Sequence, residues 1–539
     1  MAGSEEDPPI DFWPPGEEQV RVWDGRFPAV DSLRDPVQAP PAAAPPLPEE
    51  QPIDFWPATP PIDGVPSNPA TEADLDEYSV AGDQVGQMRV PVLVSDDRPD
   101  ERLFVAAFDG TGANKFEPEL GPPSGVAQLF DQLQARNAAG ELDNISAGYV
   151  PGPGTGRYGT ADGATGHTFE ERAETMYRMF IEQAAEWLEK NPDADIRVAA
   201  MGFSRGAEEA AYFTRLVDER GIADPTGAQY TLGPDGLVTS VQYTKEPLVP
   251  PGEVIQAAAL MDPVAEGDPR NYDRRLPPSV VSALQITARD EARDQFIGTP
   301  HLPPGMSDDG RSLNVTVPGV HSNIGDAYEL DGLGTRNTNM LAEYLNGLID
   351  SDKPVFSTRP EPPLGDPSNV IHDSEQHHPW IYTRQGFDAD GVRDTNLQLG
   401  APEYEEVMVT PEGDTEQRAI LRESDTRREP IDETLAAGLE YRPLAEARSE
   451  ATERVPGQDV AVQSAESQFD RLARAAMEGR ADDALAAGRE HADSQAGQTW
   501  RQEGAAAARE AERAQDAART LPPMPPMVDE VARGAPVMR

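Results

Sequence analysis

The sequence predicts an α/β fold with a mostly parallel sheet and helices on both of its faces. Short apolar runs typical of buried strands alternate with longer segments whose apolar residues recur at helical spacing. The apolar runs are 103–108, 195–201, 254–261 and 313–317, and helical segments at 124–137, 169–190 and 205–220 separate the first three. Because parallel strands need crossover connections, this alternation favours a sheet that is buried on both sides.

Each element follows from its local pattern. The helix at 169–190 places Met176, Phe180 and Trp187 on one face at intervals of three or four residues. The segment YTLGPDGLVTSVQY has a Pro-Asp-Gly turn between strand-like arms, which predicts a hairpin inserted near 221–252. Composition favours a glycine-rich loop at Gly148 to Gly166 and a helix in ALQITARDEARDQF.

Composition limits what the chain can do. It has 539 residues, no cysteine, and 96 Asp and Glu against 45 Lys and Arg, a formal net charge of −51. The lack of cysteine excludes disulfides, thiolate metal sites and thiol catalysis. The negative charge argues against a nucleic-acid partner. No stretch approaches the ~20 apolar residues of a membrane-spanning helix, and the acidic start does not resemble a signal peptide, so a soluble chain is expected.

Three domains are predicted from shifts in composition. Residues 1–98 are acidic and rich in proline, which predicts a disordered segment. Residues 99–425 form the predicted catalytic domain, loop-rich toward its end. Residues 426–539 turn to Ala, Glu, Arg and Gln, typical of a helical or disordered tail. That tail is either a secretion or partner-binding module or a solvated extension.

The N-terminal segment contains a short repeat. The hexapeptide PIDFWP occurs at 9–14 and again at 52–57. It is either a linear motif that docks twice into a partner or duplicated low-complexity sequence whose aromatic residues cover the chain's own surface.

The motif Gly202-Phe203-Ser204-Arg205-Gly206 fits the G-x-S-x-G pattern. It follows an apolar strand and opens a helix, which is the setting of a nucleophile elbow. On such a strained turn the residues two away from the serine must lack side chains that would collide. Ser204 is therefore the predicted nucleophile, with Gly202 and Gly206 as the elbow glycines.

A serine nucleophile needs a base and an acid that follow it in the order Asp, then His. His321 lies directly after the apolar run 313–317, where a loop can carry it over the serine. Asp262 directly follows the run 254–261 and is the predicted acid, which would orient the imidazole. The rival carboxylates are Asp268, Asp290 and Asp326.

The turn at 108–112 has two interpretations. Phosphatases with an aspartyl nucleophile also carry Asp-Gly-Thr, but they need an Asp where this chain has Ala107. The favoured interpretation is an oxyanion hole, formed by the backbone N–H of Gly110 or Thr111 together with that of Arg205. The cluster His372, Asp373, Glu375, His377 and His378 is spaced too irregularly for a typical metal site and is more typical of a surface loop.

Together these motifs resemble the lipase and phospholipase effectors of type VI secretion. The segments FDGTG, YVPGPGTG, GFSRGA, MDPV, ALQITARDEARDQF and VPGVHSNIGDAY occur in that family's order, over about Leu103 to Leu348. The resemblance implies an α/β-hydrolase fold, phospholipid ester hydrolysis by Ser204, Asp262 and His321, and no cofactor. It also implies synthesis in the bacterial cytoplasm, delivery into a target cell without a cleaved signal peptide, through a secretion apparatus or adaptor, and a cognate immunity protein. Family members usually have Asp at position 323, a glycine-rich run at 326–327, and Trp-Asp-Thr-Val at the acid turn.

The leading hypothesis is therefore a serine lipase or phospholipase that acts on membrane phospholipid through an acyl-enzyme. The alternatives are a carboxylesterase of non-membrane substrates and a non-catalytic binding protein built on a hydrolase fold.

Overall fold

The structure is a computed structural model that describes residues 65–117, 120–377, 393, 395, 399, 403–408, 415–420 and 427–447. The chain divides into two units, Met1–Arg454 and Val455–Arg539, and all described residues belong to the first. The PIDFWP repeat, the predicted tail beyond residue 447 and His378 lie outside the described residues. Among the described residues, no helix has the length and apolarity needed to cross a membrane.

A seven-stranded sheet forms the centre of the described residues, in the order β11-β12-β10-β9-β6-β4-β5. All neighbours pair in parallel except the edge strand β11, which is antiparallel to β12. The strands are β4 (Glu101–Phe108), β5 (Ile145–Val150), β6 (Asp195–Phe203), β9 (Gln256–Met261), β10 (Val280–Ala288), β11 (Gly305–Met306) and β12 (Ser312–Val317). The predicted α/β fold with a mostly parallel sheet is thus confirmed.

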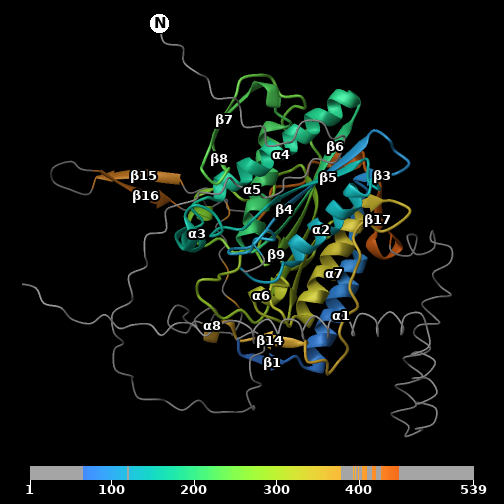
Figure 1. The fold of residues 1–539 in the computed structure, drawn as a ribbon, viewed down its shortest axis with the longest axis vertical. Coiled ribbons are helices and arrows are strands. Elements are labelled where there is room, and N and C mark those ends of the chain that lie inside the picture. The colour runs from blue at the N-terminus through green and yellow to red at the C-terminus, as the bar shows by residue number, and fades with distance from the viewer. Residues whose placement is uncertain are drawn as a thin grey trace, which may run out of the picture. The chain divides into compact units, whose positions relative to one another are not determined.

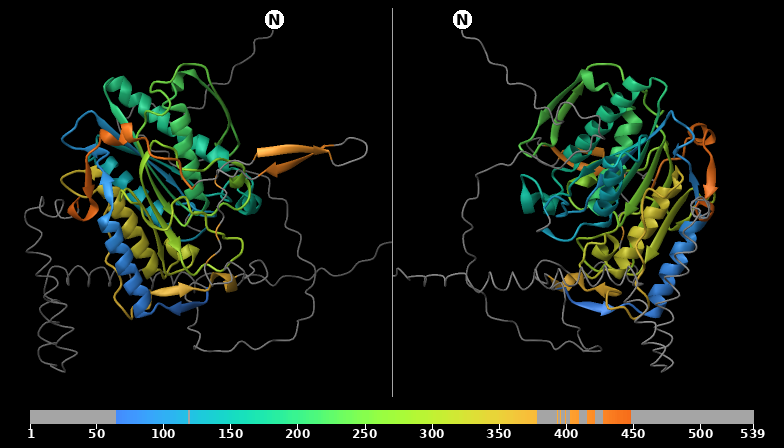
Figure 2. Two further views of the ribbon diagram at one scale, coloured as in Figure 1. Left: turned by 180° about the vertical axis from the view of Figure 1, so that it is seen from behind. Right: turned by 45° about the vertical axis from the view of Figure 1, so that its right-hand side comes forward.

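Helices cover both faces of this sheet. Figure 1 shows α4 and α5 on one side and α2, α7 and α1 on the other, and the views from behind and from the side agree (Figure 2). These five helices are α1 (Glu72–Gln87), α2 (Gly125–Ala138), α4 (Phe169–Lys190), α5 (Arg205–Arg220) and α7 (Gly332–Gly347). The shorter helices in the described part of the chain are α3 (Gly159–Thr165), α6 (His321–Ile324), α8 (Ser374–His377) and α9 (Glu433–Ala437).

Three strands of the sheet, β5, β10 and the two-residue edge strand β11, were not expected from the sequence. β5 lies partly in the predicted glycine-rich loop. It was not recognised as a strand because its sequence ISAGYV has small residues where helix α4 packs. A Cβ at Gly148 would approach the Met176 sulfur to 2.7 Å. The predicted helix in ALQITARDEARDQF is wrong, since its first half belongs to β10. This strand is rich in β-branched residues and almost wholly buried, which favours a strand over a helix.

The predicted boundary between a disordered segment and the catalytic domain is also corrected. Residues 65–98 contain helix α1 and the short strands β1 (Ser67–Pro69), β2 (Arg89–Pro91) and β3 (Val94–Ser95). Thr71 caps α1 in a capping box with Asp74. The buried Tyr78 donates its hydroxyl to the Pro318 carbonyl, 2.7 Å away, so α1 packs against the loop that leads to His321. The proline content of the preceding sequence concealed this ordered portion.

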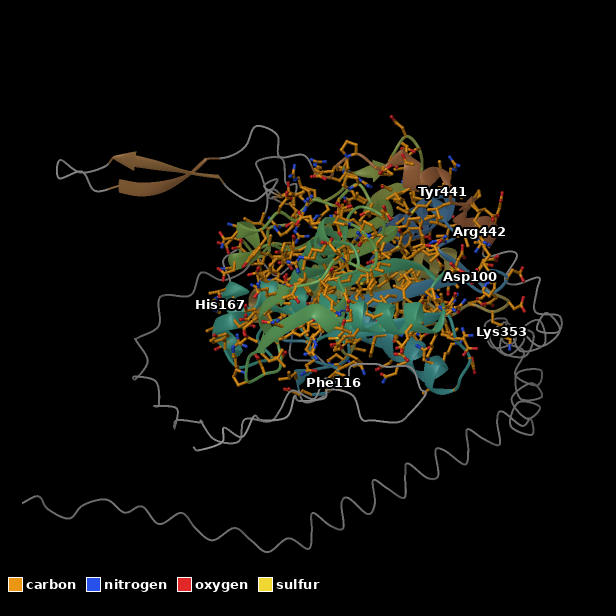
Figure 3. All side chains as sticks on the ribbon, turned by 90° about the horizontal axis from the view of Figure 1, so that it is seen from above. Asp100, Phe116, His167, Lys353, Tyr441 and Arg442 are labelled. Atoms are coloured by element: carbon orange, nitrogen blue, oxygen red, sulfur yellow. The ribbon has the colours of Figure 1, made fainter. Side chains whose placement is uncertain are left out.

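On the C-terminal side, part of the predicted tail pairs with the segment that precedes the central sheet. Strand β17 (Tyr441–Pro443) pairs antiparallel with β2, and the adjacent Leu444 is buried. Tyr441 and Arg442 lie on the side of the body away from His167 (Figure 3).

The remaining strands form small two-stranded sheets. The expected hairpin is β7 (Ala228–Leu232) with β8 (Val238–Tyr243). The other pairs are β13 (Ile349–Asp350) with β3, β14 (Val370–His372) with β1, and β15 (Glu403–Met408) with β16 (Thr415–Ile420).

Candidate active site

Ser204 occupies the sharp turn between strand β6 and helix α5. Its φ of 61° is in the left-handed region, which is costly for a residue with a side chain. A Cβ at Gly202 would run into the carbonyl of Gly206, and a Cβ at Gly206 would run into the carbonyls at the end of β4. The two glycines therefore let the turn close, as the nucleophile-elbow pattern predicts.

The structure brings together the three residues that were expected to converge. Asp262 directly follows β9, and His321 is the first residue of α6, just beyond β12. His321 Nε2 lies 2.7 Å from Ser204 Oγ, and His321 Nδ1 lies 2.6 Å from Asp262 Oδ2. All three side chains are buried. A continuous hydrogen-bonded chain thus runs from carboxylate to imidazole to hydroxyl at one edge of the sheet.

The Asp262 carboxylate is held on both oxygens. Oδ1 accepts from the Ala288 amide at 2.9 Å and from Arg393 Nη1 at 2.6 Å, while Oδ2 faces His321. Burial alone raises the pKa of Asp262, but the positive charge of Arg393 and the hydrogen bonds from His321 and Arg393 hold that pKa well below its usual range. The acid is therefore ionised at neutral pH.

His321 is enclosed by aromatic rings and charged groups. Phe203 stacks on the imidazole with ring centroids 4.7 Å apart, and Phe296 meets it edge-on at 4.9 Å. Burial lowers the pKa of His321 below its ordinary value of 6.5, and the bond to Asp262 offsets this only in part. The neutral imidazole, which can accept a proton from Ser204, therefore predominates at neutral pH. Glu291 also supports this residue by accepting from its backbone N–H at 3.1 Å.

The predicted oxyanion donors differ in whether their backbone N–H groups already have an acceptor. The Gly110 N–H donates to Asp109 Oδ1 at 2.8 Å, so it is already engaged. Thr111 is exposed and its N–H has no acceptor among the described residues. The Arg205 amide is the first of α5, where no preceding helical carbonyl satisfies it. The Arg205 guanidinium donates to Thr111 Oγ1 at 2.9 Å, so the side chains of the two residues that carry the candidate donor amides are hydrogen-bonded to each other.

The rival carboxylates have other partners. Asp268 is partly exposed and pairs with His167, and Asp290 pairs with Arg289. Asp326 accepts hydrogen bonds from Gln128 and Thr338 and pairs with Arg359. None of the three has a hydrogen bond to His321 among the described contacts.

Two of the other histidines are buried in structural networks. His301 lies 3.1 Å from Glu208, which also pairs with the buried Arg274. His372 stacks on Tyr328 with centroids 3.8 Å apart. Among the described residues, no group of three or more Asp, Glu or His side chains is arranged to hold a metal ion. His378 and the side chain of His377 lie outside them.

The departures from the resembled family have local explanations. Asn323 stands where the resemblance implies Asp, and its amide donates to Asp331 Oδ1 at 2.8 Å, a hydrogen bond that an ionised carboxylate at this position could not donate. Asp326 stands in the usual glycine-rich run and itself adopts a φ of 55°. A cleft of about 290 Å³ lies beside this turn, lined by Asp326, Asp331 and Arg359 among others; the triad residues do not line it.

Sequence reasoning missed three charged residues of the site, namely Arg393, Glu291 and the partner of Glu291, Arg293. Arg393 lies 131 residues from its partner Asp262 in the chain, in a region without strand or helix patterning. Glu291 was assigned to a helix that does not form. The signal for Glu291 was its place just beyond the β-branched run 280–288, whereas no local signal marks Arg393.

Comparisons with known proteins agree with the predicted family. Residues 102–232 match the model of the catalytic domain of Tle1-like phospholipase effectors of the type VI secretion system (T6SS), which confirms the resemblance seen in the motifs. No curated protein matches the chain.

Solved structures show distant likenesses. An uncharacterised protein from Pseudomonas aeruginosa is 15% identical, with a TM-score of 0.30, over 51% of this chain and 49% of that one. The chain thus spans about half the length of that protein. Esterase 2 of Thermogutta terrifontis is 13% identical, with a TM-score of 0.25, over 47% of this chain and 87% of that one. An acetyl xylan esterase is 13% identical, with a TM-score of 0.20, over 45% and 98%.

Proposed function

We propose that this chain is a serine phospholipase that hydrolyses ester bonds of membrane phospholipids through an acyl-enzyme. The observation that carries the proposal is the hydrogen-bonded chain Ser204–His321–Asp262, with its distances of 2.7 and 2.6 Å. The match to the catalytic domain of Tle1-like phospholipase effectors supports the choice of substrate class.

In the proposed mechanism, Ser204 Oγ attacks the ester carbonyl carbon while His321 Nε2 takes its proton. Asp262 keeps the Nδ1 proton of His321 directed toward itself and stabilises the imidazolium. The amides of Thr111 and Arg205 hold the negative oxygen of the tetrahedral intermediate. His321 then protonates the departing alcohol, and a water molecule activated by the same imidazole releases the fatty acid and restores Ser204.

The proposal extends to where the enzyme acts. As an effector of the T6SS type, the chain would be made in a bacterial cytoplasm and delivered into a target cell, with an immunity protein protecting the producer. The net charge of −51 opposes binding to anionic membranes, so the enzyme would need a local contact between exposed apolar side chains and the lipid. Tyr158, 44% exposed beside α3, and Leu248, 41% exposed in the insertion, are available for it. Periplasmic expression of the wild type, but not of Ser204→Ala, is expected to stop growth of a bacterial host.

The test of the chemistry is labelling by a fluorophosphonate, which reacts with activated serines. Wild type is expected to be labelled and Ser204→Ala to remain unlabelled with an unchanged melting temperature. Ser312→Ala, a change at a serine outside the site, is the matched control and should be labelled like the wild type. A wild type that remains unlabelled would instead support a non-catalytic binding protein.

The test of the substrate compares release of fatty acid from phospholipid vesicles with cleavage of short-chain soluble esters. The proposal expects a higher kcat/KM on vesicles, abolished in Ser204→Ala. Activity on soluble esters with indifference to vesicles would replace the phospholipase with a carboxylesterase.

A further inference from the structure

Arg393 contacts the acid of the triad from a part of the chain far beyond it. Its guanidinium donates to Asp262 Oδ1 at 2.6 Å and to the Ala288 carbonyl at 3.1 Å through Nη1. Through Nη2 it donates to the Phe296 carbonyl at 2.6 Å. Only 5% of the Arg393 side chain is exposed. Burying this charge costs desolvation free energy, which the ion pair with Asp262 and the hydrogen bonds to the two carbonyls offset.

We propose that Arg393 is a positioning residue that fixes the orientation of the Asp262 carboxylate and sets the pH range in which His321 acts as a base. This inference rests on the proposed function, because it assigns a role within the same triad. The hydrogen bonds of Arg393 go to Asp262, Ala288 and Phe296 rather than to Ser204 or His321, so we assign its action to Asp262 and Phe296.

The positioning follows from how the hydrogen bonds are shared. Asp262 adopts a φ of 41°, in the left-handed region, so its backbone does not by itself favour this geometry. With Oδ1 held by Arg393 and by the Ala288 amide, the carboxylate cannot rotate about its Cβ–Cγ bond without breaking two bonds, and Oδ2 stays directed at Nδ1. The same guanidinium also holds the Phe296 carbonyl, and the Phe296 ring forms a wall of the imidazole site.

The effect on pH follows from the charges around the imidazole. Two anions, Asp262 and Glu291, interact with His321, and two cations, Arg293 and Arg393, act on this group. On the adjoining segment, Asp290 and Arg289 form an ion pair with each other, so their charges balance. Removing Arg393 makes this set net negative, which stabilises the imidazolium and raises the pKa of His321. Because labelling of Ser204 needs neutral His321, the acid limb of its pH profile would move to higher pH.

The test measures the rate of fluorophosphonate labelling of Ser204 from pH 4.5 to 9 in the full chain. We expect Arg393→Gln to move the acid limb up by about one pH unit, a roughly tenfold lower rate on that limb. Arg393→Lys keeps the charge but can hold fewer of the three acceptors. It should keep the acid limb near its wild-type position while lowering the rate at every pH.

The matched control is Arg289→Gln. Arg289 directly follows Ala288 and pairs with Asp74, Glu77 and Asp290, none of which has a hydrogen bond to a triad residue among the described contacts, so its removal should leave the acid limb in place. Melting temperatures of all variants separate loss of fold from loss of positioning.

The outcomes separate failure of the proposed role of Arg393 from failure of the proposed hydrolase. An Arg393→Gln variant that folds and is labelled with an unmoved or lowered acid limb overturns the role of Arg393. If Arg393→Gln does not fold, Arg393→Lys decides, and a labelling rate equal to wild type at every pH overturns it. A wild type that is not labelled at all contradicts the proposed hydrolase itself, whatever Arg393 does.

Discussion

The two sides of the triad are built in different ways. On the nucleophile side, Ser204 is set by the absence of side chains at Gly202 and Gly206, which lets backbone segments approach closely. On the acid side, Asp262 is set by buried charges, above all Arg393. One side therefore depends on steric fit and the other on electrostatic balance. Substitutions on the two sides should fail differently. On the first side an added side chain clashes with backbone, and on the second a lost charge changes protonation and the pH dependence of activity or stability.

Asp262→Asn should give the largest loss of activity. An asparagine can present its amide N–H to His321 Nδ1, which stabilises the wrong tautomer and leaves Nε2 unable to accept the Ser204 proton. We expect kcat to fall about 10⁴-fold, as is typical for loss of this carboxylate. Ester hydrolysis is measured beside the melting temperature, because the substitution also leaves the buried Arg393 without its anion and should lower the free energy of unfolding by about 3–5 kcal/mol. The prediction is a loss of kcat in the protein that remains folded.

The control for this substitution is Asp268→Asn. Asp268 is the rival carboxylate that pairs with the exposed His167, and its neutralisation should leave activity near wild type. If Asp268→Asn abolishes hydrolysis and Asp262→Asn does not, the acid is misassigned and the electrostatic side of the comparison lies elsewhere.

The same contrast explains what the sequence could predict. The glycines around Ser204 are neighbours in the chain, so the elbow is visible as a local pattern. Asp262 and His321 were predictable because the first directly follows a recognisable apolar strand, the second lies just beyond another, and parallel strands end at one edge. Arg393 was not predictable, since a buried ion pair across 131 residues leaves no local pattern.

The fold likewise divides into elements that a local sequence pattern reveals and elements that depend on contacts with distant segments. Strands with aliphatic runs, such as β4 and β6, were predicted correctly. Strand β5 was missed because its small residues serve the packing of α4, a demand that only the assembled structure reveals. The helix and strands within residues 65–98 were not predicted, because they are stabilised by contacts with distant segments, such as that of Tyr78 with Pro318.

Gly206→Ala should have the next largest effect, and it tests the steric side. The added Cβ would run into the Phe108 and Asp109 carbonyls, which belong to backbone and cannot move aside as a flexible side chain would. We expect the start of α5 to be displaced, the fluorophosphonate labelling rate to fall about 100-fold or more, and the melting temperature to drop by several degrees.

Gly82→Ala is the matched control for that steric argument. Gly82 lies within α1, and a Cβ there meets no heavy atom within 4 Å. Alanine should stabilise the helix by about 0.5–1 kcal/mol and leave labelling unchanged. If the two alanine variants had the same labelling rate and melting temperature, the nucleophile side would not depend on steric fit at Gly206.

Glu291→Gln should have the smallest effect on activity but a clear effect on stability, and it sharpens the electrostatic side. Glu291 is buried and accepts hydrogen bonds from Arg293 and from the His321 backbone. Removing this partner should lower the free energy of unfolding at pH 7 by about 3–5 kcal/mol, while hydrolysis by the folded protein falls less than about tenfold, since the triad keeps its contacts.

The pH dependence of that stability provides the decisive readout. Although burial raises the pKa of Glu291, the hydrogen bond and charge of Arg293 hold it below its ordinary value of 4.5. Its stabilisation is therefore fully present above about pH 4.5 and is lost as the pH falls through the lower folded-state value. Urea unfolding of the Glu291→Gln variant should accordingly lose less stability than wild type on acidification below pH 4.5. The exposed Glu433→Gln, which pairs with Arg311 at the surface, should follow the wild-type curve. Parallel curves for wild type and Glu291→Gln would mean that Glu291 contributes by shape alone, and the acid side would then resemble the steric side after all.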